Sequence, residues 1–248
     1  MKNVTGRGLR VLLPVGALLA VMAIVGVRSK VVAQGQGGGP GLPDLVPMGL
    51  GNAAVTNRLG GPTFEFNTLT ANIGGQEFNR PRDPGTGQLL LRQIYEYVLY
   101  NRQFVNGHGW TWVEIDRRRK NTICTIDDHR VGTHAGEPDF SCIVEHDNPT
   151  HFCGNNEGVS RGWADDYFRG LNGQWVFIGD NTGRFMLEAI LDPDGDLQRT
   201  DIPDSGKDGD PTNNFAQVFF TWDGSTLGPQ QVILSFDAGS ICPTTSNK

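Results

Sequence analysis

The segment Phe64-Glu-Phe-Asn-Thr-Leu-Thr-Ala-Asn-Ile73 decides the fold class, because it alternates apolar with polar residues. Alternation with a period of two puts successive side chains on opposite faces of a half-buried β-strand. Further short runs of this kind follow, separated by Gly, Pro, Asn and Asp. We therefore predict an all-β fold, a single β-sandwich-like domain with long functional loops at its ends.

The other predicted strands are short and closely spaced. Residues 88–100 are long enough for a helix, but their Tyr, Ile and Val content favours a strand. Three strand pairs are predicted on either side of polar turns. These are 110–115 with 122–126 around the basic stretch 116–120, 174–178 with 184–191, and 215–222 with 231–236.

The N-terminus has the features of a secretory signal peptide. Lys2, Arg7 and Arg10 precede an apolar run over residues 11–27, and Val31-Val32-Ala33 supplies a small-residue cleavage pattern. We expect a signal peptide at 1–33, a flexible Gly-rich leader at 34–43 and the β domain at 44–248. An uncleaved membrane anchor is the alternative, and either reading places the domain outside the cytoplasm, secreted or at the cell surface.

The charge of the expected mature chain is strongly negative. Removing residues 1–33 takes away five of the 21 basic residues and none of the 27 acidic ones, which leaves a net charge of −11. This balance excludes nucleic acid as an expected partner and favours cationic partners, lysine-rich proteins among them. Membrane contact is expected only through an uncleaved anchor.

The four cysteines, Cys124, Cys142, Cys153 and Cys242, are even in number. In an oxidising compartment this predicts up to two disulfides, whose connectivity stays open. The CxxC spacing of a zinc ribbon is absent from the sequence.

Two motifs carry the clearest chemical information. The first is Gly158-Val-Ser-Arg-Gly-Trp-Ala-Asp-Asp-Tyr167, closed by Gly173-Gln-Trp175, and the second is Lys120-Asn-Thr-Ile-Cys-Thr-Ile-Asp127. Together with Pro43-Asp-Leu-Val-Pro47 and Asp208-Gly-Asp-Pro-Thr-Asn-Asn214, and in this order, they resemble the lysyl oxidase family, in particular its bacterial members.

The resemblance implies a cofactor made from two side chains. Lysyl oxidases join a lysine to a tyrosine under copper to form lysine tyrosylquinone, and Lys120 and Tyr167 stand at those two positions. They would be both catalytic and cofactor-forming, in the oxidative deamination of primary amines such as lysine side chains to aldehydes, with release of peroxide and ammonia. Read alone, Lys120 ends an exposed basic run and Tyr167 is an amphipathic loop residue.

The copper ligands of the family are not found at their expected place. The histidine cluster would fall near residues 88–91, which here are Gln-Leu-Leu-Leu. Four histidines, His129, His134, His146 and His151, instead lie between Cys124 and Cys153. They are either an alternative transition-metal site or exposed loop histidines. The amine oxidase activity of the family is therefore either retained or lost in this chain. The alternative function is a non-catalytic, calcium-stabilised extracellular β-sandwich that serves as a binding or structural module.

The resemblance also implies a calcium site. Calcium takes about six to eight oxygen ligands from carboxylates, amides and carbonyls. Matched to the family, its ligands would be Asp44, Leu45 through its carbonyl, Asp208, Asp210, Asn213 and Asn214. Such an ion would connect the two ends of the domain.

Overall fold

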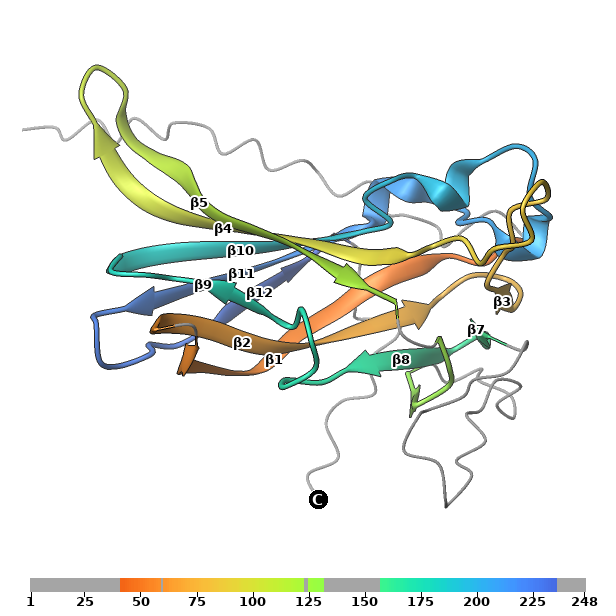
Figure 1. Cartoon of the computed structure of the whole chain (residues 1–248), viewed down its shortest axis with the longest axis horizontal. Coiled ribbons are helices and arrows are strands. Elements are labelled where there is room, and N and C mark those ends of the chain that lie inside the picture. Colours follow the sequence, from red (N-terminus) through yellow and green to blue (C-terminus); the bar gives the residue numbers. More distant parts are fainter. Residues whose placement is uncertain (1–40, 59, 123–124, 132–156, 236–248) are drawn as a thin grey trace, which may run out of the picture. The chain divides into compact units, whose positions relative to one another are not determined.

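The computed structural model describes residues 41–58, 60–122, 125–131 and 157–235. In this part of the chain two antiparallel β-sheets pack face to face, which confirms the predicted all-β sandwich (Figure 1). The expected signal peptide, most of the leader, all four cysteines and three of the histidines lie outside the described residues.

The first sheet has the order β1-β2-β8-β6, and β9 also pairs with β2. Its strands are β1 (Leu45–Arg58), β2 (Gly61–Asn72), β6 (His129–Arg130), β8 (Trp163–Tyr167) and β9 (Trp175–Phe177). The second sheet has the order β12-β11-β10-β4-β5. Its strands are β4 (Gln93–Val105), β5 (Gly109–Asn121), β10 (Gly183–Leu191), β11 (Phe215–Trp222) and β12 (Gln231–Leu234).

Smaller elements lie beside the two sheets. A short ladder joins β3 (Phe78–Asn79) to β7 (Gly158–Val159). Three single-turn 3₁₀ helices, η1 (Asp196–Gln198), η2 (Asp204–Gly206) and η3 (Pro211–Asn213), follow β10 and lead into β11. No helix in the described ranges is both long and apolar enough to cross a membrane.

Aromatic side chains from both sheets fill the core. Phe64 of β2 stacks on Phe220 of β11 with 4.1 Å between ring centroids, and Phe66 meets Tyr97 of β4 edge-on at 4.7 Å. Aromatic pairs of this kind contribute about 0.5–1.5 kcal/mol each beyond the area that they bury. The alternation in residues 64–73 therefore does predict a strand, because the even-numbered side chains of its first half face the core.

Hydrogen bonds between hydroxyl groups join the sheets next to this aromatic core. Thr68 and Thr70 of β2 lie 2.9 Å from the phenol oxygens of Tyr97 and Tyr95, respectively. All four side chains are buried, so these bonds satisfy groups that water cannot reach. They fix the separation of β2 and β4 where the candidate site begins.

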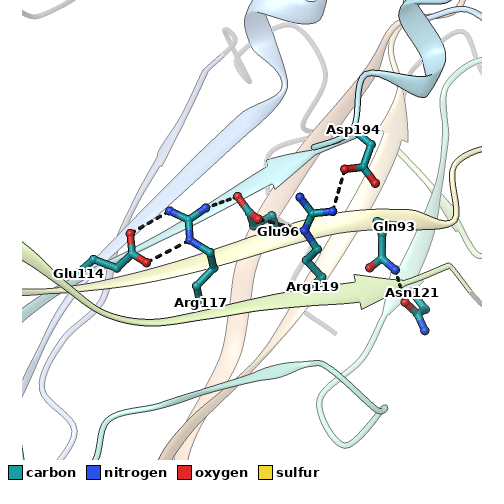
Figure 2. Close-up of polar contacts among 7 residues, drawn as sticks. All are labelled: Gln93, Glu96, Glu114, Arg117, Arg119, Asn121 and Asp194. Atoms are coloured by element: carbon teal, nitrogen blue, oxygen red, sulfur yellow. Dashed lines mark hydrogen bonds and ion pairs between the residues drawn. The ribbon is translucent and has the colours of Figure 1, made fainter.

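The prediction of a basic turn at 116–120 is wrong, because these residues belong to the continuous strand β5. Arg117 and Arg119 point to one face, where Glu96 of β4 lies between them and Asp194 pairs with Arg119 (Figure 2). These carboxylates compensate the repulsion between the arginines, so the run of charge can stay extended. The turn lies earlier, between β4 and β5, and their hairpin extends beyond the neighbouring strands (Figure 1).

The predicted pairing of 174–178 with 184–191 is also wrong, because these strands belong to different sheets. β9 pairs with β2, whereas β10 pairs with β4 and β11. The polar turn signal at 180–183 therefore marks a crossing between sheets, which needs the same turn-forming residues as a hairpin. The predicted pair of 215–222 with 231–236 is confirmed as β11 and β12.

Candidate functional site

The alternation of β5 turns Lys120 into the sandwich. Its Cα lies opposite Tyr95 of β4, and only 1% of the residue is exposed. The amine Nζ donates a hydrogen bond of 2.7 Å to the carbonyl oxygen of Asn172. No ion pair to Lys120 occurs within the described residues, which is rare for a buried lysine.

Tyr167 ends β8 in the opposite sheet, where it pairs with Thr68 and is 2% exposed. Its ring meets that of Tyr95 edge-on, with 6.3 Å between centroids. The Nζ of Lys120 lies 5.3 Å from the centroid of the Tyr167 ring, within the range of a cation–π contact. The expected proximity of Lys120 and Tyr167 is therefore confirmed, and their catalytic role stays a prediction.

Burial sets the protonation of this pocket. It lowers the pKa of Lys120 to about 8, although the charge of Asp165 acts in the opposite direction. Roughly a tenth of the amine is then neutral at pH 7, far more than for an ordinary lysine, and the neutral amine is the nucleophilic form.

Asp165 lies two residues before Tyr167, on the same face of β8, and the two side chains are hydrogen-bonded. Burial raises the pKa of both groups well above their ordinary values, and the charge of Asp165 raises that of Tyr167 further. Oδ2 of Asp165 has no hydrogen-bond partner among the described residues. Asp165 and Tyr167 therefore form a buried acid pair beside the amine.

The Gly173-Gln174-Trp175 segment packs against Lys120 and its neighbours on β5. Gly173 has φ +79°, and a Cβ at this position would lie 3.3 Å from Cδ of Lys120. Gln174 is fully buried: its amide donates to Thr68 at 2.6 Å and its Oε1 accepts from Tyr97 at 3.1 Å. Trp175 stacks on Arg118, whose guanidinium carbon lies 3.5 Å from a ring centroid of the indole.

The two sequence motifs also contact each other directly. Asp127 accepts hydrogen bonds from the backbone N–H of Ser160 at 2.7 Å and from its hydroxyl at 2.6 Å. These bonds tie the segment after Lys120 to the segment before Tyr167. Each motif thus contributes both a pocket residue and the contact that positions it.

The described residues around Tyr167 do not fit a copper ion. Cu(II) prefers imidazole nitrogen, and the nearest described histidine along the sheet, His129 of β6, is exposed. Its Nε2 lies 3.1 Å from Oδ2 of Asp166, which points to the face of β8 opposite to Asp165 and Tyr167.

The predicted histidine site is not assembled in the described part of the chain. No three His, Cys, Asp or Glu side chains there form a group that could hold a metal. His134, His146 and His151 lie outside the described residues.

Four of the six expected calcium ligands do come together. Asn213 donates to Asp44 at 3.0 Å, Asn214 donates to Asp208 at 2.6 Å, and all four side chains are buried. Burial raises the pKa of Asp208 to about 7, and the charge of Asp44 adds to this rise. Two carboxylates and two amides are a set of oxygen donors that suits calcium.

The side-chain oxygens of the two asparagines favour a cation in this cluster. Oδ1 of Asn213 and Oδ1 of Asn214 are buried and have no hydrogen-bond partner among the described residues. Rotation of each amide by half a turn would bring both oxygens to the carboxylates, an arrangement that a bound cation would stabilise.

The remaining two expected ligands have other contacts. The backbone N–H of Leu45 donates to Oδ1 of Asp208 at 3.2 Å, so the backbone at Leu45 lies at this cluster. Asp210 instead caps η3, where its Oδ1 accepts from the backbone N–H of Thr212 at 3.0 Å and from its hydroxyl at 2.5 Å.

Sequence reasoning missed three contributors to the pocket. Asp165, Tyr95 and the carbonyl of Asn172 were not singled out, although Asp165 follows from strand periodicity once Tyr167 is placed on a core face. No protein-family model and no curated protein matches this chain.

Proposed function

We propose that this chain is a secreted lysyl-oxidase-like protein, in which Lys120 and Tyr167 are the precursors of a lysine tyrosylquinone. The activity would be oxidative deamination of primary amines, including lysine side chains of extracellular proteins. The observation that carries the proposal is the position of the Lys120 amine, 5.3 Å from the centre of the Tyr167 ring in a shared buried pocket.

The protonation of the pocket supports this function. If copper and oxygen oxidised the Tyr167 ring, as the family requires, an amine with a pKa of about 8 would add to it at a smaller cost of deprotonation than an ordinary lysine. Asp165 is hydrogen-bonded to the phenol of Tyr167 and so helps to hold the ring beside Lys120. If the quinone formed, Asp165 would be the carboxyl group next to it that could exchange a proton with a bound amine.

The proposal is tested on the secreted protein after incubation with copper. Peroxide release is measured with a primary amine such as butylamine, and a carbonyl reagent is used to titrate the quinone. Lys120→Arg and Tyr167→Phe are expected to abolish both signals. Lys207→Arg and Tyr100→Phe, the same substitutions outside the pocket, should leave them intact. A protein that binds no carbonyl reagent and releases no peroxide would contradict the proposal.

A second function is favoured by a separate observation, the lack of an imidazole near Tyr167 in the described residues. It is a non-catalytic extracellular β-sandwich, stabilised by calcium at Asp44, Asp208, Asn213 and Asn214. This function predicts calcium-dependent stability with no amine turnover. Turnover that disappears in Tyr167→Phe would exclude it.

A further inference from the structure

A cavity of about 350 Å³ lies on the second sheet, on the face turned away from the Lys120–Tyr167 pocket. Its lining includes Arg102, Trp112, Arg184, Phe219, Thr221 and Gln231. Phe185 and Phe220 are buried and also line the cavity. Arg184, Phe219 and Thr221 alternate with them along β10 and β11, so these three side chains face outward. The volume is at the lower end of the range for small-ligand sites.

Strand register brings the polar residues of the cavity into one row. Arg102 pairs with Trp112 across β4 and β5, and Arg184 pairs with Thr221 across β10 and β11. Because β4 and β10 are neighbours, the two guanidinium groups lie in adjacent strands on one face. Two like charges placed this way repel each other unless an anion lies between them.

Arg102 and Arg184 differ from Arg117 and Arg119, on the same face of the sheet, in having no carboxylate partner among the described residues. Neither Arg102 nor Arg184 forms an ion pair within the described residues, whereas Arg117 and Arg119 both do. Arg102 does lie over the ring of Trp110, with its guanidinium carbon 5.7 Å from the ring centroid. A cation–π contact of this kind leaves the charge without a counter-ion.

The carboxylates on the same face are engaged elsewhere. Glu114 pairs with Arg117, and Glu188 accepts a hydrogen bond from Gln217. The guanidinium groups of Arg102 and Arg184 can therefore bind the acid group of a ligand.

Two aromatic side chains lie beside these arginines. The rings of Trp112 and Phe219 meet at 60° with 5.8 Å between centroids, although two strands separate β5 from β11. Both residues are only half-buried, so their ring faces remain partly open to a ligand. A flat apolar body would stack here and keep its acid group at the arginines.

We propose that this cavity binds a small aromatic carboxylate, with the ring against Trp112 and Phe219 and the carboxylate between Arg102 and Arg184. Thr221 and Gln231 offer a hydroxyl and an amide to polar substituents on the ring. A polyanion fits less well, because the whole chain carries a net charge of −6 and repels a dense run of negative charge. The site is independent of the proposed amine oxidation.

Calorimetry on the full secreted chain tests this site with 3-phenylpropanoate as the probe. Its neutral amide and glucuronate, a sugar carboxylate, are the comparison ligands. The aromatic carboxylate is expected to bind at least about tenfold more tightly than its amide, as charge-assisted hydrogen bonds to arginine require. Glucuronate should bind more weakly, because it lacks an aromatic face.

Variants locate the binding. Arg184→Gln should weaken the aromatic carboxylate about tenfold or more, and Trp112→Ala should weaken both the carboxylate and the amide. Arg92→Gln, the same change at an exposed arginine before β4, should leave the affinity unchanged. Arg184 is itself exposed, so its variant is expected to fold, and thermal melting verifies this.

Three results would overturn the site. They are no detectable binding of 3-phenylpropanoate at millimolar concentration, equal affinity for acid and amide, and unchanged binding in a folded Arg184→Gln protein. Tighter binding of glucuronate than of the aromatic acid would overturn the ligand class.

Discussion

At the scale of single residues, Lys120 is the unusual feature of this molecule. A lysine that is 1% exposed normally has a carboxylate partner, yet Lys120 donates its hydrogen bond to a backbone carbonyl. Burial therefore acts against its charge and lowers its pKa to about 8. Burying this amine beside Tyr167 therefore destabilises the fold. A strongly perturbed pKa of this kind is typical of functional sites.

The pKa of Lys120 predicts how stability depends on pH. The folded state binds fewer protons than the unfolded state between pH 8 and the ordinary lysine value of 10.5, so stability rises with pH in this window. Lys120→Met keeps an unbranched side chain of nearly the same length without the charge, so it lacks this dependence. Urea unfolding is measured at several pH values across the window. The free energy of unfolding of the wild type should rise by on the order of 2–3 kcal/mol relative to that of the variant. A difference that stays constant with pH would contradict the shifted pKa.

At the scale of elements, β5 and the turn at Gly173 form the pocket together. The strand delivers Lys120 to the core face, and the turn closes over its aliphatic part because Gly173 has no Cβ. The positive φ of Gly173 disfavours other residues as well. The sequence Gly173-Gln174-Trp175 is thus explained by packing against β4 and β5.

Gly173→Ala tests this closure against a matched glycine. Gly107 in the β4–β5 turn has a similar φ of +84°, but a Cβ there would have no atom within 4 Å, whereas at Gly173 the Cβ would meet Lys120. Both changes should lower the free energy of unfolding by about 1 kcal/mol, because alanine is strained in the left-handed backbone conformation. Gly173→Ala should lower the free energy of unfolding by about another 1 kcal/mol, because its Cβ would crowd Lys120. Equal losses in urea unfolding would show that the turn does not press on Lys120.

The elements also show what could be predicted from the sequence. The strands at 64–73 and 215–222, and most of the one at 88–100, followed from alternation and β-branched or aromatic content, which reflect a half-buried surface directly. The last of these, β4, begins at Gln93 instead of residue 88 and continues to Val105. The error at 116–120 has a different origin. A run of three arginines and a lysine looks like an exposed turn until Glu96 and Asp194, from other elements, are known to face it.

At the scale of the whole molecule, the buried cluster around Asp44 and Asp208 joins the start of β1 to the segment before β11. Backbone hydrogen bonds reinforce the contact, since Gly209 donates to the carbonyl of Pro43 at 2.7 Å. The sequence predicted this convergence only through a family pattern, because no local rule relates positions so far apart. The same pattern predicts no copper site at the family's position, because residues 88–91 supply no imidazole.

Calcium is expected to stabilise the whole domain through this cluster. An ion at about 100 times its dissociation constant adds about 2.7 kcal/mol, which corresponds to a rise in Tm of about 5–10 °C. Asp208→Asn should remove the calcium-dependent part, since it replaces a buried carboxylate. Asp204→Asn, at an exposed aspartate nearby, should keep it. Thermal melts with calcium and with a chelator check this prediction. The same wild-type Tm under both conditions would show that calcium does not stabilise the domain.

The central claim is that Lys120 and Tyr167 share one pocket from which a covalent link can form. Mass-spectrometric peptide mapping of the copper-treated secreted protein tests it most directly. We predict a single joined species that contains the peptides of residues 120 and 167 and is absent from Lys120→Arg. Recovery of the two peptides separately and unmodified, from a folded and copper-treated protein, would contradict the claim.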